Sequence, residues 1–453
     1  MQMELFKHQQ ESLDQTKDFN RVAYYLDMGL GKTFVGSEKM KEFGTGLNIL
    51  VCQKSKIDDW VEHFESYYSK THVIFNLTNK GELIDFLCKV ETKAKIGVIN
   101  YDLLFRRSDF LHIEHFTLIL DESSMVQNDK AKRSKFVMQM KPDNVILLSG
   151  TPTSGKYENL WTQIHLLGWN ISKDLYNKQY VNWKKIDVGG FPQWIVDKDD
   201  PYKNVERLKS KLRQHGAIFM KTEECFELPE QIMIPVLIKT TKEYRKFQKD
   251  CFVTVKGTAW VEDPKESDFY GTAYQLEDIE LIGDTTLTKR LYSRQLCGQY
   301  NKDKLQAFKD LASSTQDRLI VFYNYNAELE ALKRIAAELE RPISEVNGQN
   351  KDLSNYENED NSITFIQYQA GAMGLNLQKA NKIVYFTLTD KSELFEQSKK
   401  RIHRIGQNNT CFYYLMMCKH SVEEDILQTL EMRKDYSDEL FKEYEQGDKN
   451  ETW

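Results

Sequence analysis

The sequence predicts an α/β protein of two lobes, each a mainly parallel sheet flanked by helices, with helical insertions. Short apolar runs that end in polar or glycine residues and lead into helical spacing recur in both halves. The rhythm is interrupted near the middle, and 453 residues exceed one ordinary core of about 150 residues. We therefore predict a first lobe over 1–228 with an insertion at about 168–216, and a second over 229–453 with a helical linker at about 241–315.

The composition is that of a soluble globular protein, with 40% hydrophobic and 29% charged residues. No apolar run approaches the roughly 18 residues of a membrane helix, and the start lacks a secretion signal, so we expect a cytoplasmic protein without membrane contact. The seven cysteines form no C-x-x-C pair, which argues against a disulfide framework and a zinc cluster. A net charge of −6 gives no global attraction for nucleic acid, so any such binding needs local basic surface.

The stretch from Leu26 to Thr33 resembles a phosphate-binding loop between a strand at 22–26 and a helix. Gly29 and Gly31 permit a tight wrap whose N–H groups point at phosphate oxygens, together with those of Met28 and Leu30. Lys32 then reaches the terminal phosphates and the Thr33 hydroxyl ligates magnesium. The alternative is a plain glycine turn, because Leu26 stands where the strict pattern has its first glycine.

Further strands of the first lobe are expected at 47–52, 96–101, 116–120 and 144–148. The run 116–120 leads directly into Asp121 and Glu122, so both carboxylates lie at the carboxyl end of a buried strand, where ligands bind in α/β sheets. Asp121 holds magnesium and Glu122 orients or deprotonates the attacking water in this reading. The alternative is an ordinary strand end with exposed acids.

Two smaller features accompany this edge of the sheet. The strand at 144–148 ends in a segment with Ser149 and Thr151, which could bond to the carboxylates and couple to a moving lobe, or could be only a turn. A short helix over 4–14 carries Gln9, which could face an adenine edge or solvent. In the insertion, residues 203–213 form either a phosphate-binding basic face or a solvated helix.

The second lobe repeats the pattern, with strands at 318–323, 363–366, 382–386 and 412–417 and a helix at 326–340. The glycine-rich stretch 369–377 permits close approach of backbone to a ligand. In 395–407, Arg401 and Arg404 are three residues apart and would share one face of a helix, either as arginine fingers or as basic surface. The tail from Lys434 is charged, and we expect it to fray.

Together these motifs resemble the superfamily 2 helicase-like ATPases, and within them the Swi/Snf-type DNA translocases. The matching segments run in the family order over nearly the whole chain, and the pair 28–33 and 401–407 is the most specific of them. The resemblance implies two RecA-like lobes with ATP and magnesium in the cleft and duplex DNA across the top. The chain is similar to compact bacteriophage and bacterial forms, which implies a bacterial or phage-infected host cell.

Carried over residue by residue, the resemblance implies that Gln9 contacts adenine. It also implies that Lys32 and Thr33 contact phosphate and magnesium, and that Asp121 and Glu122 contact metal and water. Arg401 and Arg404 would be the fingers. Four further residues would couple the lobes or complete the site: Ser149, Thr151, Gly374 and Gln397. Ser123 and Ser124 replace the usual small residue and histidine after Asp-Glu, so coupling of hydrolysis to DNA is expected to differ.

The resulting hypothesis is a DNA-stimulated ATPase that moves along duplex DNA in replication, recombination or repair. Its expected partners are double-stranded or branched DNA and replication or recombination proteins. One alternative is a true helicase that separates strands or remodels forks, for which the sequence shows no separating wedge. The other is a nucleotide-gated DNA-binding scaffold with little turnover.

Overall fold

The computed structural model describes residues 4–188, 191–262, 274–371 and 375–441. Its contacts divide the chain into a first unit, Met1–Glu227 with Arg433–Trp453, and a second unit, Leu228–Met432. The sequence-based division instead keeps the C-terminal residues in the second lobe. No helix among the described residues combines the length and the apolar character that crossing a bilayer requires.

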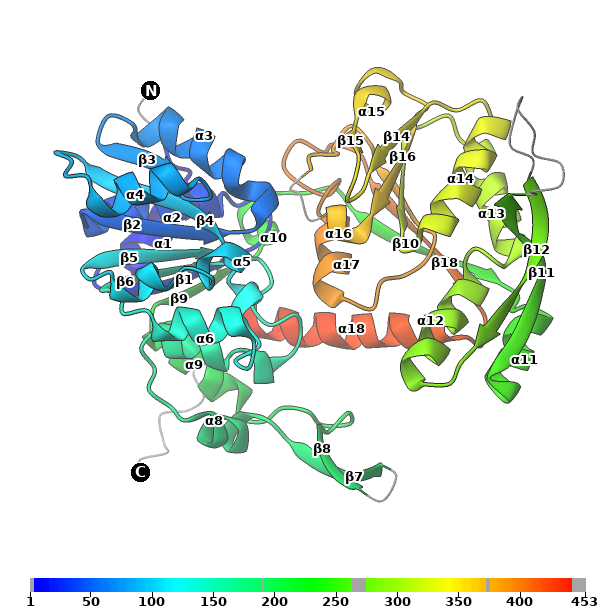
Figure 1. The fold of residues 1–453 in the computed structure, drawn as a ribbon, viewed down its shortest axis with the longest axis horizontal. Coiled ribbons are helices and arrows are strands. Elements are labelled where there is room, and N and C mark those ends of the chain that lie inside the picture. The colour runs from blue at the N-terminus through cyan, green and yellow to red at the C-terminus, as the bar shows by residue number, and fades with distance from the viewer. Residues whose placement is uncertain (1–3, 189–190, 263–273, 372–374, 442–453) are drawn as a thin grey trace. The chain divides into compact units, whose positions relative to one another are not determined.

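The first unit holds a seven-stranded sheet in the order β3-β4-β2-β5-β6-β1-β9, with every adjacent pair parallel (Figure 1). Its strands are β1 (Arg21–Leu26), β2 (Leu47–Cys52), β3 (His72–Asn76), β4 (Ala94–Asn100), β5 (Phe116–Asp121), β6 (Asn144–Leu148) and β9 (Ala217–Met220). Its helices are α1 (Lys7–Gln15), α2 (Lys32–Phe43), α3 (Ile57–Tyr68), α4 (Lys80–Cys88), α5 (Tyr101–Leu104), α6 (Lys132–Gln139), α7 (Trp161–Leu166), α8 (Lys173–Tyr180), α9 (Val205–Gln214) and α10 (Thr222–Cys225). Short 3-10 turns lie at Lys54–Lys56, Ser108–His112, Ser123–Val126 and Tyr157–Asn159.

The central strands of this sheet are apolar on both faces because helices cover both. Along β1, Ala23 and Tyr25 belong to one buried cluster, whereas Val22, Tyr24 and Leu26 belong to another. Alternate side chains of a strand point to opposite faces, so the continuous apolar runs in the sequence are what a doubly covered parallel sheet requires. All these strands end at one edge, which brings together the segments that follow them.

The second unit has its own seven-stranded sheet, in the order β10-β18-β17-β13-β16-β14-β15. All adjacent pairs are parallel except β14 with β15. The strands are β10 (Gln231–Ile238), β13 (Leu319–Tyr323), β14 (Ile343–Val346), β15 (Lys351–Asp352), β16 (Ile363–Gln367), β17 (Lys382–Tyr385) and β18 (Cys411–Cys418). The helices are α11 (Lys242–Asp250), α12 (Thr286–Cys297), α13 (Lys302–Ser313), α14 (Asn326–Glu338), α15 (Ser354–Asn358), α16 (Tyr368–Gly371), α17 (Ser392–Lys399) and α18 (Val422–Phe441). Two parallel-sheet units flanked by helices confirm the predicted fold class.

The expected helical linker at 241–315 is wrong in its middle part. Between α11 and α12 the chain forms two long antiparallel strands, β11 (Phe252–Glu262) and β12 (Tyr274–Ile282). Val253 and Val255, two positions apart on β11, and Leu281 of β12 are buried in the core of the second unit. This alternation with β-branched residues is the strand pattern, which outweighs the acidic and polar residues between them.

The C-terminal tail is helical, not frayed, from Lys434 to Phe441, and the rest of the tail, 442–453, lies outside the described residues. Helix α18 continues to Phe441, and its last part joins the first unit, where Tyr436 and Phe441 pack against the core cluster. The Tyr157 hydroxyl donates to the Tyr436 carbonyl at 2.8 Å. An apolar residue every four or five positions, ending in Leu440 and Phe441, supplies the stripe that holds the helix in place.

Candidate nucleotide-binding site

The predicted phosphate loop follows β1 and opens α2, as its sequence indicates. Gly29 and Gly31 adopt positive φ angles of 92° and 75°, which other residues rarely tolerate. A side chain at Gly31 would also collide with the amide of Gln9. Helix α2 begins at Lys32, so the loop's N–H groups and the helix N-terminus face the same place. These two glycines are therefore needed for the backbone shape itself.

The Lys32 side chain folds back over the end of β1. Its ammonium donates to the Leu26 carbonyl at 2.9 Å and to the Asp27 carbonyl at 3.4 Å. The Asp27 carboxylate accepts from the Met28 N–H at 2.8 Å and from the Thr222 hydroxyl at 3.1 Å. The ammonium of Lys32 thus bonds only to neutral carbonyls in these two contacts. An anion at the loop can replace them as its hydrogen-bond partner.

Helix α1 is fastened to the phosphate loop by two side chains. The ring Nε2 of His8 and the amide of Gln9 both donate to the Leu30 carbonyl, each at 3.1 Å. The Gln9 amide oxygen accepts from the Phe6 N–H at 3.0 Å, and Gln9 is buried. A pocket of about 390 Å³ lies beside this helix, lined by Phe6, Lys7, His8, Glu11, Met220, Glu224, Cys225 and Phe226.

The predicted carboxylate pair lies at the end of β5. The Trp60 indole N–H donates to Asp121 Oδ2 at 2.8 Å, and the Glu122 backbone N–H donates to Oδ1 at 3.1 Å. Burial raises the pKa of Asp121. The Trp60 hydrogen bond and the charges of Lys32 and Lys56 lower it, but burial has the larger effect. The sequence did not reveal this role of Trp60, because the carboxylate lies 61 residues further along the chain.

Glu122 adopts a left-handed backbone with φ of 49°, a conformation that non-glycine residues seldom hold without a reason. The Ser149 hydroxyl at the tip of β6 donates to Glu122 Oε2 at 3.3 Å and accepts from the Thr151 N–H at 3.1 Å. The Thr151 hydroxyl is buried and has no hydrogen-bond partner among the described residues. The structure therefore brings together Glu122 and Ser149, as the sequence predicted.

The glycine between these two hydroxyl residues brings the strand tip close to the phosphate loop. A Cβ atom built on Gly150 would lie 3.3 Å from the Lys32 ammonium. The ends of β1, β5 and β6 thus form one constellation of lysine, carboxylates and small hydroxyl residues. Thr33, partly buried at the second position of α2, belongs to the same loop.

A buried glutamine connects the unusual Ser123 to this constellation. The Gln163 amide oxygen accepts from the Ser123 hydroxyl at 2.8 Å and from the Tyr25 hydroxyl at 3.0 Å. Its amide nitrogen donates to the Pro152 carbonyl at 2.7 Å. Gln163 is fully buried on α7, and sequence reasoning missed it because no local pattern marks a polar residue whose partners lie on three other segments.

In the second unit, the expected helix through both arginines is wrong. Helix α17 ends at Lys399, and Arg401 and Arg404 lie in the turns that follow it. Arg401 is buried, and its carbonyl accepts from the Leu377 N–H at 3.1 Å. Arg404 is partly exposed, and burial lowers its pKa from the ordinary value. Compact turns after a short helix are consistent with the glycine at position 406.

The remaining predicted residues of this unit have separate outcomes. Gln397 is buried on α17 and donates to Glu393 at 3.3 Å. Gly374 lies outside the described residues. Gln407, the last residue of the segment 401–407, donates to the Gln378 carbonyl at 3.1 Å and to the Ala380 carbonyl at 2.9 Å. It therefore fixes the arginine-bearing turns against the segment after the glycine-rich stretch.

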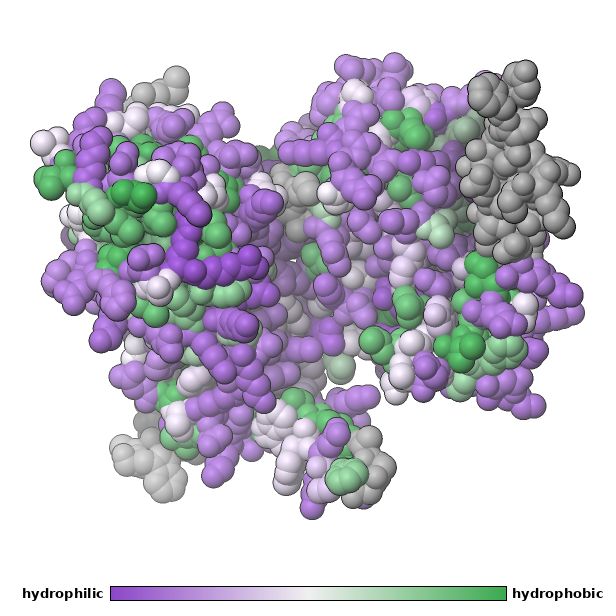
Figure 2. Space-filling model, viewed as in Figure 1, coloured by the Kyte–Doolittle hydropathy of each residue, from purple (hydrophilic) through white to green (hydrophobic). Residues whose placement is uncertain are grey.

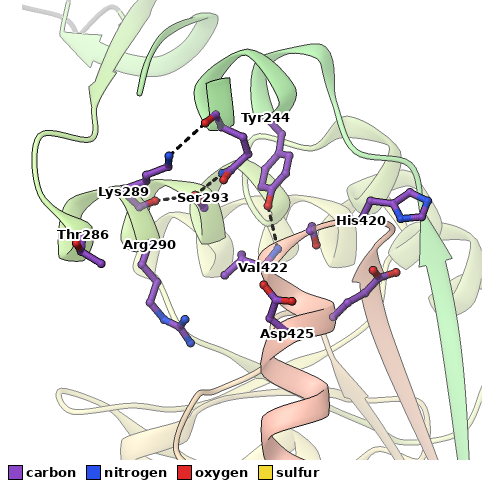
Figure 3. Close-up of a pocket in the computed structure, with 11 residues that line it drawn as sticks. Tyr244, Thr286, Lys289, Arg290, Ser293, His420, Val422 and Asp425 are labelled. Atoms are coloured by element: carbon purple, nitrogen blue, oxygen red, sulfur yellow. Dashed lines mark hydrogen bonds between the residues drawn. The ribbon is translucent and has the colours of Figure 1, made fainter. Parts of the chain in front are cut away.

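A different pocket of about 480 Å³ lies in the second unit, where α11 and α12 meet the start of α18 (Figure 3). Several of its polar groups bond to one another. The Tyr244 hydroxyl accepts from the Val422 N–H at 2.9 Å, and Gln248 donates to the Ser293 hydroxyl at 2.6 Å. Lys289 donates to the Gln248 carbonyl at 3.2 Å. These bonds join the α11–α12 region to α18, and we assign the pocket no ligand.

One buried cluster offers metal-ligand atoms. Cys297, Cys418 and Glu423 place one ligand atom each within 4.8 Å of one another. The buried ammonium of Lys304, however, lies 2.6 Å from the Glu423 carboxylate. Burial alone would lower the pKa of Lys304, but the carboxylate raises it, so the lysine stays charged. The cluster already contains its own cation, and we interpret it as a structural ion pair.

The residues of the first unit fit a magnesium nucleotide. Backbone N–H groups, a helix N-terminus and Lys32 suit phosphate oxygens, while the Thr33 hydroxyl and the Asp121 carboxylate are the hard oxygen ligands that magnesium prefers. Asp121 is buried with a raised pKa, so a nearby cation would favour its charged form.

Comparison with known proteins matches two family models to this chain. The model of the SNF2-related domain matches residues 25–299, and that of the helicase conserved C-terminal domain matches residues 303–406. A solved structure, the Sulfolobus solfataricus SWI2/SNF2 ATPase core in complex with dsDNA, has 18% identity and a TM-score of 0.43. The alignment covers 97% of this chain and 93% of that one.

Two curated relatives illustrate the range of similar proteins. The SWI/SNF-related matrix-associated actin-dependent regulator of chromatin subfamily A member 1 of Mus musculus is 21% identical, over 90% of this chain and 40% of its own length. The putative ATP-dependent helicase/translocase YwqA of Bacillus subtilis is 23% identical, over 91% of this chain and 46% of its own length. The chain thus spans less than half the length of these two relatives. Because the SNF2-related domain model alone matches more than half of the sequence, the chain belongs to the Snf2 family of helicase-like ATPases, which use ATP, typically with magnesium.

Proposed function

We propose that this chain hydrolyses ATP to move along duplex DNA, and that DNA stimulates the hydrolysis. The observation that carries the proposal is the constellation at the edge of the first sheet, where Lys32, Asp121, Glu122 and Ser149 meet. Such a set serves phosphoryl transfer, because it combines a phosphate cradle, metal ligands and a carboxylate that can orient water. The Snf2 family supports DNA as the track.

In this proposal, Lys32 leaves its two carbonyl acceptors and binds the terminal phosphates. Thr33 and Asp121 would hold magnesium, which would offset negative charge on the phosphoryl group. Trp60 favours the ionised form of the buried Asp121 through its 2.8 Å hydrogen bond, in opposition to the effect of burial. Glu122 orients the attacking water and accepts its proton, and Ser149 holds the carboxylate in place.

Helix α1 would bind the base of the nucleotide. Gln9 holds the phosphate loop through Leu30 and lies next to the pocket lined by Phe6 and Phe226. We propose that adenine enters this pocket, with the Gln9 amide at its edge. Because both Gln9 polar atoms already bond to backbone groups, base binding and loop shape are coupled through one side chain.

From the second unit, Arg401 and Arg404 would stabilise charge on the transferred phosphoryl group, and Gln397 and Gly374 would complete the site. Gln407 holds the turns that carry both arginines. In the first unit, Ser149 and Thr151 would couple hydrolysis to movement. The Ser123–Gln163–Pro152 bonds join the carboxylate loop to that same strand tip, so we propose that they replace the usual histidine-based coupling.

The experiment is steady-state ATP hydrolysis by the purified chain without DNA, with single-stranded DNA, with blunt duplex and with forked duplex. Strong stimulation by blunt duplex supports the proposal. Stimulation by single strands or forks alone would favour a strand-separating helicase, and absence of turnover under all four conditions would leave a nucleotide-gated scaffold. Replication, recombination or repair is the setting we propose, with proteins of those processes as partners.

A further inference from the structure

The insertion in the first unit carries a feature that the nucleotide site does not use. Between α8 and α9 the chain forms an antiparallel hairpin of β7 (Trp183–Val188) and β8 (Phe191–Val196). The hairpin projects beyond α8 at the lower edge of the view (Figure 1). Neither strand makes extensive contacts with another helix or strand in the described part of the chain. The sequence pattern indicates an insertion here but does not indicate a hairpin.

The register of the hairpin shows which side chains share a face. Trp183 pairs with Val196 and Lys185 pairs with Trp194, so Trp183, Lys185 and Trp194 lie on one face. Phe191 is the first residue of β8, next to the turn, and lies on the other face with Lys184. The two tryptophans are diagonal neighbours with a lysine opposite one of them.

These aromatic side chains face solvent to an unusual extent. The exposed fractions are 75% for Phe191, 64% for Trp194 and 38% for Trp183. In Figure 2 the hairpin region mixes green and pale residues with purple ones. A two-stranded hairpin gains little stability from side chains that it leaves in water, so exposed aromatic residues on both faces mark a binding surface.

The strands of the hairpin carry more positive than negative charge. The strands carry Lys184 and Lys185 against one acid, Asp187, while the other acids lie at the base of the hairpin, in 197–200. Lys184 has a long ion pair of 3.8 Å with Asp199, and no carboxylate in the described ranges pairs with Lys185. Cations interleaved with flat aromatic rings suit unpaired nucleic acid, because phosphates meet the cations while bases stack on the rings.

We propose that the β7–β8 hairpin binds unpaired bases of DNA at a junction between duplex and single strands. Trp194 and Phe191 stack on bases, and Lys184 and Lys185 contact the adjoining phosphates. The hairpin would thereby recognise the junction and direct the chain to forked DNA. The inference rests on the proposed function only in taking DNA as the substrate.

The test is equilibrium binding without nucleotide, by fluorescence anisotropy, to labelled single-stranded, forked and blunt duplex DNA. We expect Trp194→Ala and Phe191→Ala each to weaken binding to single-stranded and forked DNA by about tenfold, the scale of one lost stacking contact. The loss on blunt duplex should be much smaller. Trp194→Phe should retain most of the affinity, because any aromatic ring stacks.

Leu175→Ala is the matched control, since Leu175 is an exposed apolar residue on the neighbouring helix α8. We expect it to bind all three DNAs like the unchanged chain. Thermal melting checks that each variant is folded. Equal losses on all three DNAs, or unchanged binding of forked DNA by both alanine variants, would overturn the proposal.

Crosslinking gives a second readout that does not depend on affinity. A 5-iodouracil placed at the first unpaired nucleotide of a fork should crosslink to peptides of 183–196. Crosslinks confined to other segments would reject the hairpin as the junction contact. Both experiments omit ATP, so a chain that binds forks through the hairpin but never hydrolyses ATP would contradict the proposed function and leave this inference standing.

Discussion

Trp60→Phe removes the indole N–H that donates to the buried Asp121 carboxylate at 2.8 Å while keeping most of the aromatic packing on α3. A hydrogen bond to a charged group contributes roughly 1.5–3 kcal/mol. It favours the ionised form of Asp121, so its loss raises the pKa of that carboxyl further. We predict that Trp60→Phe weakens magnesium-dependent turnover most at low pH.

The expected shift of the pH profile follows from the free energy of this hydrogen bond. One pH unit corresponds to about 1.4 kcal/mol, so the acid limb of kcat/KM for magnesium ATP should move upward by about one pH unit or more. The assay is ATP hydrolysis over a pH series at subsaturating nucleotide. At high pH, where the carboxyl is ionised in both proteins, the rates should converge.

Tyr68→Phe is the control for this prediction. It lies on the same helix and loses a hydrogen bond of the same length, 2.8 Å, but that bond ends on Glu38 of α2. The variant should leave the acid limb where it is. An unmoved acid limb in folded Trp60→Phe, or an equal movement in Tyr68→Phe, would refute the assigned role of Trp60.

Three further predictions test other parts of the account. Lys32→Ala should abolish ATP turnover with little change in thermal melting, and unchanged turnover would remove the phosphate-loop assignment. Arg404→Ala should keep nucleotide affinity but slow hydrolysis roughly a thousandfold, as loss of an arginine finger does, whereas a change in DNA affinity alone would make it basic surface. Burial lowers the pKa of His63 from 6.5 to about 4, so the unfolded chain binds more protons between these values. The free energy of unfolding should therefore fall as pH drops from about 6.5 to 4, and denaturant unfolding of His63→Gln should show a weaker dependence.

Much of the first unit could be predicted because its signals are local. The loop 26–33 has its glycines where the backbone needs positive φ, and Asp121 follows a buried strand at the edge where ligands bind. Parallel strands that end at a common edge then bring Glu122 and Ser149 together without further information.

The roles of Trp60 and Gln163 could not be predicted, because their partners are distant in sequence. The Trp60 indole reaches a carboxylate 61 residues away, and Gln163 bonds to Tyr25, 138 residues away. Nothing in the local pattern around either residue distinguishes it from core packing. Such contacts become visible only when the strands are placed side by side.

Two local readings were wrong for different reasons. Arg401 and Arg404 have helical spacing, but α17 ends before them and the turn is held by Gln407, a tertiary contact. The strands β11 and β12 were read as helix because charged residues obscured their alternation. In the first place a tertiary contact outweighed the local spacing, whereas in the second the strand alternation was present in the sequence but obscured by charge.

The most direct test of the central claim is displacement of a third DNA strand from a triplex by the chain moving along the duplex. The account predicts displacement that requires ATP and that is absent with a non-hydrolysable analogue and in Lys32→Ala. ATP hydrolysis stimulated by duplex DNA, without any displacement of the third strand, would contradict movement along DNA.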